Sequence, residues 1–187
     1  KSMSRTTRKL NVKAQTHQYW LDMMNQSKYV KEKHDGYNTG ALIDQIQDRT
    51  AQLLGKQSAL FFHKGVAAQL VALKVSAEIK SNNKLILHPN SHIAVDESNA
   101  YQELIGLRGI EIGKVFQPFD CQAVTKITEK VATLVVELPL RRAGFKLTPW
   151  DELVKMQQWS QSSNTHLHMD GARLWESTYY YEKSLTE

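Results

Sequence analysis

Apolar residues recur along this chain in two patterns. Between residues 41 and 54, apolar side chains such as Leu42, Ile46 and Leu53 return at the spacing of one helix face. Residues 132–137, Ala-Thr-Leu-Val-Val-Glu, instead form a short, mostly apolar run rich in β-branched residues, which is typical of a buried strand. Residues 66–79 are apolar on nearly every side, which predicts a helix that is buried on most faces.

Extended over the whole chain, the two patterns alternate. The predicted strands are 58–62, 84–87, 110–112, 132–137 and 165–170. The predicted helices are 41–54, 66–79, 96–107, 124–131, 149–160 and 172–181, with one or two more within 14–33. Short apolar strands that alternate with helices indicate an α/β fold, a three-layer sandwich with a mostly parallel sheet.

This fold class predicts where a ligand binds. Ligands of open α/β sheets lie beyond the carboxyl ends of the strands. We therefore expect the segments 63–66, 88–92, 137–144 and 168–173 to approach one another at one edge of the sheet.

Composition is that of a globular protein, but its charge is unevenly placed. The 187 residues are 41% hydrophobic and 23% charged, enough for one domain with a sizeable core. Residues 1–33 carry eight basic and two acidic side chains, whereas the remainder is close to neutral. A basic arm can bind nucleic acid or anionic lipid. Because residues 1–36 lack the signatures of common nucleic-acid modules, we expect a solvated segment that is helical or partly mobile, and no nucleic-acid partner.

Two features that the sequence lacks, a pair of cysteines and a long apolar segment, indicate the cellular compartment. Cys121 is the single cysteine, so a disulfide within the chain is excluded, as in proteins of reducing compartments. No apolar run approaches the roughly 20 residues that span a bilayer, and no signal peptide is visible. We expect a cytoplasmic protein without a membrane partner.

The sharpest motif is His-Met-Asp-Gly-Ala-Arg-Leu-Trp at residues 168–175. Asp170 ends a predicted strand, and Arg173 begins the next helix. A salt bridge or a helix cap at Asp170 would also account for this spacing. The octapeptide resembles the signature of the threonine aldolase and β-eliminating lyase family, pyridoxal-phosphate enzymes of the aspartate-aminotransferase fold.

Other segments resemble the family in the same order. Gln-Leu-Leu-Gly-Lys at 52–56, continuing to residue 62, is similar to the helix and strand before its phosphate loop. Ser-His-Ile at 91–93, with Glu97, is similar to its ring-stacking loop, and Glu-Leu-Pro at 137–139, followed by Arg and Gly, to a segment of part of the family. The resemblance implies that residues 37–187 form an incomplete cofactor-binding large domain.

The resemblance also implies roles for individual residues. Asp170 is expected to pair with the pyridine nitrogen, and His92 to stack on the ring and accept a proton from the substrate hydroxyl. Arg173 is expected to bind the substrate carboxylate or a phosphate oxygen. The backbone N–H groups of Gly65 and Val66 are expected to hold the phosphate at a helix N-terminus.

Two departures from the family pattern stand out. Lys64, Gly65 and Val66 replace a Ser-Gly-Thr phosphate loop, so both hydroxyls are lost and Lys64 offers a point charge instead. Phe145 stands where a second glycine is usual.

The lysine that binds the cofactor covalently in this family lies beyond the last predicted helix. The chain ends at Glu187, and Lys183 falls inside that helix. We therefore expect an N-terminal portion of a homo-oligomeric lyase, without its C-terminal small domain and inactive by itself. The intact enzyme would cleave a β-hydroxy-α-amino acid, a small-molecule substrate, to glycine and an aldehyde.

Two alternatives remain open at this stage. His166, His168 and Asp170 alternate along one strand and share a face, a plausible zinc or iron ligand set of a metal-dependent hydrolase. His88 and His92 would add ligands from a neighbouring strand end. The other alternative is a non-catalytic interaction module with a basic arm.

Overall fold

The computed structural model describes residues 15–34, 36, 37 and 39–187. The chain forms two compact units, residues 1–44 and 45–187, and their boundary lies inside helix α2 (Ala41–Leu53). The first unit contains α1 (His17–Asn25), which begins where the side chain of Thr16 accepts a hydrogen bond from the backbone N–H of Tyr19. The basic side chains between residues 1 and 13 lie outside the described residues.

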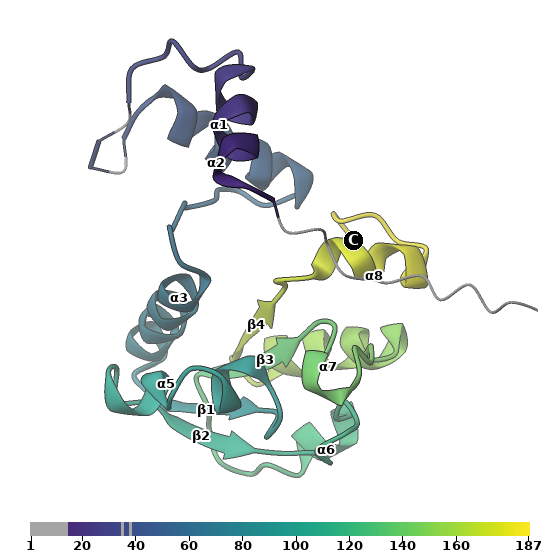
Figure 1. Cartoon of the computed structure of the whole chain (residues 1–187). Coiled ribbons are helices and arrows are strands. Elements are labelled where there is room, and N and C mark those ends of the chain that lie inside the picture. The colour runs from purple at the N-terminus through teal and green to yellow at the C-terminus, as the bar shows by residue number, and fades with distance from the viewer. Residues whose placement is uncertain (1–14, 35, 38) are drawn as a thin grey trace, which may run out of the picture. The chain divides into compact units, whose positions relative to one another are not determined.

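The second unit is built on a four-stranded parallel sheet (Figure 1). Its strands are β1 (Lys84–Leu87), β2 (Arg108–Glu111), β3 (Thr133–Glu137) and β4 (His166–Asp170), in the order β2-β1-β3-β4. Every neighbouring pair is parallel. The predicted α/β fold with a parallel sheet is therefore confirmed.

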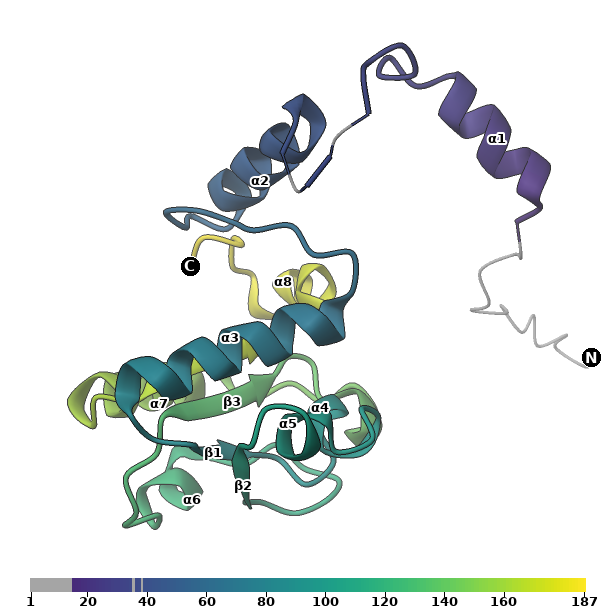
Figure 2. The same cartoon turned by 90° about the vertical axis from the view of Figure 1, so that its left-hand side faces the viewer.

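Alternating strand residues separate the core into two clusters. One cluster joins helix α3 (Gly65–Lys80) to Leu85, Leu87 and Val135. The other joins α6 (Cys121–Thr125) and α7 (Trp150–Ser162) to the side chains that point the opposite way, namely Ile86, Leu134 and Val136. Figures 1 and 2 show α3 on one face of the sheet and α7 on the other, which is the predicted three-layer sandwich.

Three predicted elements are wrong or misplaced. The helix predicted over 96–107 is two short helices, α4 (His92–Val95) and α5 (Ala100–Glu103). Ser98 and Asn99 separate them because both have positive φ, which a helix does not tolerate. The helix predicted over 124–131 begins and ends earlier, as α6, since Asp120 caps it by accepting a hydrogen bond from the backbone N–H of Ala123.

The strand predicted over 58–62 does not form. These residues are extended without a strand partner, and the backbone N–H of Phe61 donates to Oε1 of Gln47 at 2.9 Å instead. A short apolar run alone does not distinguish a strand from an irregular connection. A strand also needs a neighbouring strand that pairs with its backbone groups, and the run does not show whether one is present.

Helix α3 is less buried than its composition predicts. Its buried stripe is Leu73, Ser76 and Ala77, whereas Val75 and Ile79 are 47% and 66% exposed. The sheet covers only one side of the helix, so the remaining apolar side chains face outward. Although α3 is long and apolar, none of the described helices has the length and hydropathy to cross a membrane.

Helix α3 offers a matched test of this packing. Leu73→Ala is expected to lower the free energy of unfolding by about 2–5 kcal/mol, because it leaves a cavity between helix and sheet. Val75→Ala, on the outer face of the same helix, is expected to change it by less than about 0.5 kcal/mol. Urea unfolding followed by circular dichroism measures both, and equal losses would contradict the orientation of α3.

Candidate functional site

The carboxyl ends of the strands meet at one edge of the sheet. The register of β3 and β4 places Glu137 beside Asp170, the last residue of each strand. The loop after β1 leads to Ser91 and His92, which starts α4. Two of the predicted segments, 88–92 and 137–144, therefore lie beside the motif around Asp170 at this edge of the sheet.

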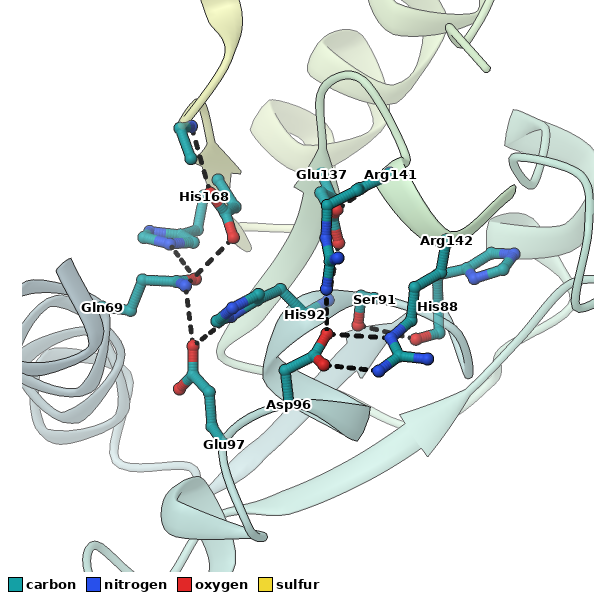
Figure 3. A network of polar contacts seen from close by, with 12 residues as sticks. Gln69, His88, Ser91, His92, Asp96, Glu97, Glu137, Arg141, Arg142 and His168 are labelled. Atoms are coloured by element: carbon teal, nitrogen blue, oxygen red, sulfur yellow. Dashed lines mark hydrogen bonds and ion pairs between the residues drawn. The ribbon is translucent and has the colours of Figure 1, made fainter. Parts of the chain in front are cut away.

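The side chain of Gln69, on α3, links these segments (Figure 3). Its amide nitrogen donates to Oδ2 of Asp170 at 3.1 Å and to Oε1 of Glu97 at 3.2 Å. Its amide oxygen lies 3.3 Å from Nε2 of His168. Since both carboxylates need a donor, the amide has one favourable orientation, and His168 must then carry its proton on Nε2.

Glu97 also holds the ring of His92. Oε1 of Glu97 lies 2.9 Å from Nδ1 of His92, and the Glu97 side chain is fully buried. Burial raises the pKa of Glu97, and the contact with His92 opposes that rise. The second oxygen, Oε2, has no hydrogen-bond partner among the described residues. His92 is thus fixed at one nitrogen while its side chain stays 35% exposed.

Glu137 fixes the backbone on both sides of the site. Its Oε2 accepts a hydrogen bond from the backbone N–H of His92 at 2.6 Å, and its Oε1 accepts one from the backbone N–H of Arg141 at 3.0 Å. The side chain of Ser91 donates to the carbonyl of His88, so it does not cap α4. A carboxylate from β3 therefore satisfies the N-terminus of α4.

A second cluster braces the same loop. Asp96 accepts hydrogen bonds from Arg141 at 2.7 Å and from Nε of Arg142 at 2.9 Å (Figure 3). The hydrogen bond from Arg142, with a further contribution from Arg141, holds the pKa of Asp96 well below its usual range. Both arginines belong to the turn η1 (Arg141–Ala143), so this turn and α4 are joined through side chains as well as through Glu137.

Asp170 sits at the start of a tight turn into α8 (Leu174–Tyr181). Its Oδ1 accepts a hydrogen bond from the backbone N–H of Ala172 at 3.2 Å. With Gln69 on its other oxygen, the carboxylate uses two of about four acceptor positions, so it retains capacity for another donor. Arg173 follows as the N-terminal cap of α8, and its guanidinium carbon lies over the ring of Phe145, 5.8 Å from the ring centre.

The predicted phosphate loop is the N-terminus of α3. Lys64 is its capping residue, and the Lys64 side chain makes no capping hydrogen bond. The space around the α-carbon of Gly65 is open, and Val66 is exposed. Because the first N–H groups of a helix lack intrahelical acceptors, Gly65 and Val66 present donors that an anion can bind.

The metal alternative gains no support from this geometry. His166, His168 and Asp170 do share a face, but Nδ1 of His166 bonds Oγ of Ser76 at 2.7 Å, and the other two contact Gln69. Nε2 of His88 donates to two backbone carbonyls. Within the described ranges, no three or more histidine, cysteine or acidic side chains are grouped as a metal site.

Sequence reasoning missed the residue that joins the site. His92 and Asp170 were expected to be close, and they are linked through Glu97 and Gln69. Gln69 was not singled out. Its signal was present, because it is a lone polar residue in the apolar stretch 66–73, on the helix face that meets the strand ends.

The fold and its site define the class of protein. A parallel sheet with helices on both faces and a polar site at its carboxyl edge is general to open α/β folds, and similar solved structures assign it to the large domain of the pyridoxal-phosphate transferases. A Listeria monocytogenes EGD-E protein assigned as an L-allo-threonine aldolase matches with a TM-score of 0.85 and 34% identity, over 88% of this chain and 46% of that one. An Exiguobacterium sp. 255-15 protein, assigned as an aromatic amino acid beta-eliminating lyase/threonine aldolase, matches with a TM-score of 0.84 and 30% identity, over 88% and 46%.

The chain belongs to the beta-eliminating lyase family, whose sequence model matches residues 20–187. The low specificity L-threonine aldolase of Escherichia coli K12 is 26% identical over 82% of this chain and 47% of its own length. Aldolase vrtJ of Penicillium aethiopicum is 27% identical over 68% of this chain and 34% of its own length. The chain therefore spans half or less of the length of these relatives.

The Gln69 contacts predict a stability effect. Gln69→Leu removes the donor shared by Glu97 and Asp170 and the acceptor of His168, so Oδ2 of Asp170 and Nε2 of His168 lose their hydrogen-bond partner and Glu97 keeps only His92. We expect a loss of about 1–3 kcal/mol in the free energy of unfolding. Gln157→Leu, an exposed glutamine of α7, is the control and should change it by less than about 0.5 kcal/mol. A native value for Gln69→Leu in urea unfolding would show that the network contributes nothing.

His168 predicts a pH dependence. Burial lowers its pKa below the ordinary 6.5, so below that pH the unfolded chain binds more protons than the folded one. Stability should fall as pH drops from 6.5 toward the lowered pKa. His168→Gln keeps a donor for Gln69 but does not titrate. As the pH falls, the unfolding free energy of this variant should therefore decrease less steeply than that of the native chain, with a difference in slope of up to about 1.4 kcal/mol per pH unit.

The comparison requires unfolding curves between pH 8 and 5 for both proteins. His63→Gln, at an exposed position, controls for the loss of one histidine. Parallel pH profiles for the native and His168→Gln proteins would contradict a buried, neutral His168.

Proposed function

We propose that this chain binds pyridoxal phosphate and is the cofactor-binding part of an enzyme that cleaves a β-hydroxy-α-amino acid to glycine and an aldehyde. The observation that carries the proposal is one network of hydrogen bonds. It links His92, at the start of α4, through Glu97, and through Gln69 of α3, to Asp170, at the end of β4. The family and the relatives described as threonine aldolases support the same reaction.

The residues present fit the cofactor. Asp170 has acceptor capacity for a protonated ring nitrogen, the His92 ring is partly exposed, and the N-terminus of α3 has open space at Gly65. Bound there, the cofactor supplies an electron sink for the pair released when the Cα–Cβ bond breaks. Lys64 would add positive charge near the phosphate, in place of the hydroxyl groups usual in the family.

The orientation of His92 suits a proton acceptor. Glu97 holds Nδ1, so Nε2 is the nitrogen that receives the proton of the substrate hydroxyl. As this O–H bond breaks, the oxygen becomes the aldehyde carbonyl and the Cα–Cβ bond is lost. Burial of Glu97 fixes the ring, because that carboxylate has little freedom to move.

Arg173 would bind the substrate carboxylate through two parallel N–H donors.

The proposal also includes self-association. Apolar side chains on the outer face of α3, including Val71, Val75 and Ile79, are exposed and would be covered by an interface.

The test begins with cofactor binding. We expect the 187-residue chain to bind pyridoxal phosphate reversibly in equilibrium dialysis, and Asp170→Asn to weaken binding by about tenfold, because a neutral amide cannot pair with a charged ring nitrogen. Asp151→Asn, which changes an exposed carboxylate of α7, should bind as the native chain does.

The same samples are assayed for aldehyde after addition of threonine. The 187-residue chain should release none in a sustained way, because none of its described lysines contacts Asp170 or His92. Sustained turnover would contradict that expectation, and the absence of any pyridoxal phosphate binding would contradict the proposed function itself.

A further inference from the structure

Phe145 holds a backbone conformation that aromatic residues rarely adopt. Its φ is +60°, in the left-handed region where the Cβ atom of an ordinary residue is crowded. Gly144 before it is also left-handed, at φ +77°. Glycine adopts this region readily, so a large side chain at such a position points to a contact that offsets the backbone cost.

A backbone hydrogen bond closes the turn at Phe145. Its backbone N–H donates to the carbonyl of Arg141 at 3.2 Å, which closes the turn after β3. The backbone N–H of Leu138 donates to the carbonyl of Asp170 at 3.0 Å. The residue that follows β3 is therefore tied to the end of β4, three residues before Arg173.

The contact in question is with Arg173. Its guanidinium carbon lies over the Phe145 ring, 5.8 Å from the centre, within the range of about 6 Å for a cation–π interaction. Arg173 caps α8 directly after the turn that Asp170 and Ala172 close. Both partners thus stand on backbone that other contacts have already fixed.

We propose that Phe145 is a positioning residue for Arg173: its ring holds the guanidinium in one orientation and preforms the site for the substrate carboxylate. An arginine has many rotamers, so fixing it in advance removes an entropic cost from binding. A guanidinium that packs by its face keeps its in-plane N–H donors free. The identity of the carboxylate rests on the proposed function, whereas the ring contact does not.

Nuclear magnetic resonance tests the ring contact directly. In the native chain, the side-chain protons of Arg173 should be shifted upfield by the Phe145 ring. Phe145→Leu keeps a side chain on the same backbone and should abolish this shift, whereas Phe145→Tyr should retain it. Arg173→Lys identifies the signals. Native signals in Phe145→Leu would overturn the inference.

Titration with acetate tests the carboxylate site. Phe145→Leu and Phe145→Gly should both weaken acetate binding at Arg173 by about three- to tenfold, although only the glycine relaxes the backbone. Phe145→Tyr should bind acetate as the native chain does. Ser81→Gly, at another residue with positive φ (+47°), controls for the glycine substitution and should leave binding unchanged.

The outcomes separate the two proposals. If neither Phe145→Leu nor Phe145→Gly weakens acetate binding, the positioning role is overturned while the carboxylate site stands. If the ring shift is present but acetate does not perturb Arg173, the carboxylate role assigned under the proposed function is overturned. Thermal unfolding of each variant confirms that the altered chains are folded.

Discussion

The amide of Gln69 is the contact on which the arrangement of the site depends. It donates to two carboxylates that would otherwise repel one another, Glu97 from the segment between α4 and α5 and Asp170 from the end of β4. Its helix, α3, is also the one that covers this face of the sheet and carries Gly65 at its N-terminus. The side chain of Gln69 thereby connects Asp170 to the loop that carries His92, and it lies on the helix that begins at Gly65.

The acidic side chains around this edge are matched to further partners in different ways. Glu137 accepts backbone N–H groups, Asp96 accepts two guanidinium groups, and Glu97 faces the ring of His92. These contacts leave one acidic group, Glu97, with an oxygen that nothing in the described residues satisfies. These contacts hold in place the loops around His92 and Asp170, the two groups that are arranged to act on a ligand.

Two residues of this chain stand beside the proposed site and differ from what the family resemblance leads us to expect. Lys64 offers a point charge at the N-terminus of α3, where the resemblance implies a hydroxyl group. Phe145 has a positive φ, which glycine adopts more readily, and its ring lies against Arg173. Both residues lie beside the proposed anion-binding groups, so they bear on how tightly phosphate and carboxylate are held.

By itself the sequence determined the α/β class, the parallel strands β1, β3 and β4, the helices α3 and α7, and the motif around Asp170 and Arg173. These follow from local periodicity and from residues adjacent in the chain. Only the tertiary structure decided that residues 58–62 form no strand, that α3 leaves an apolar side exposed, that Gln69 joins the site, and that Phe145 contacts Arg173. Each of these depends on which distant group a residue meets, and neither the pairing of a strand nor the partner of a side chain is encoded in its neighbours along the chain.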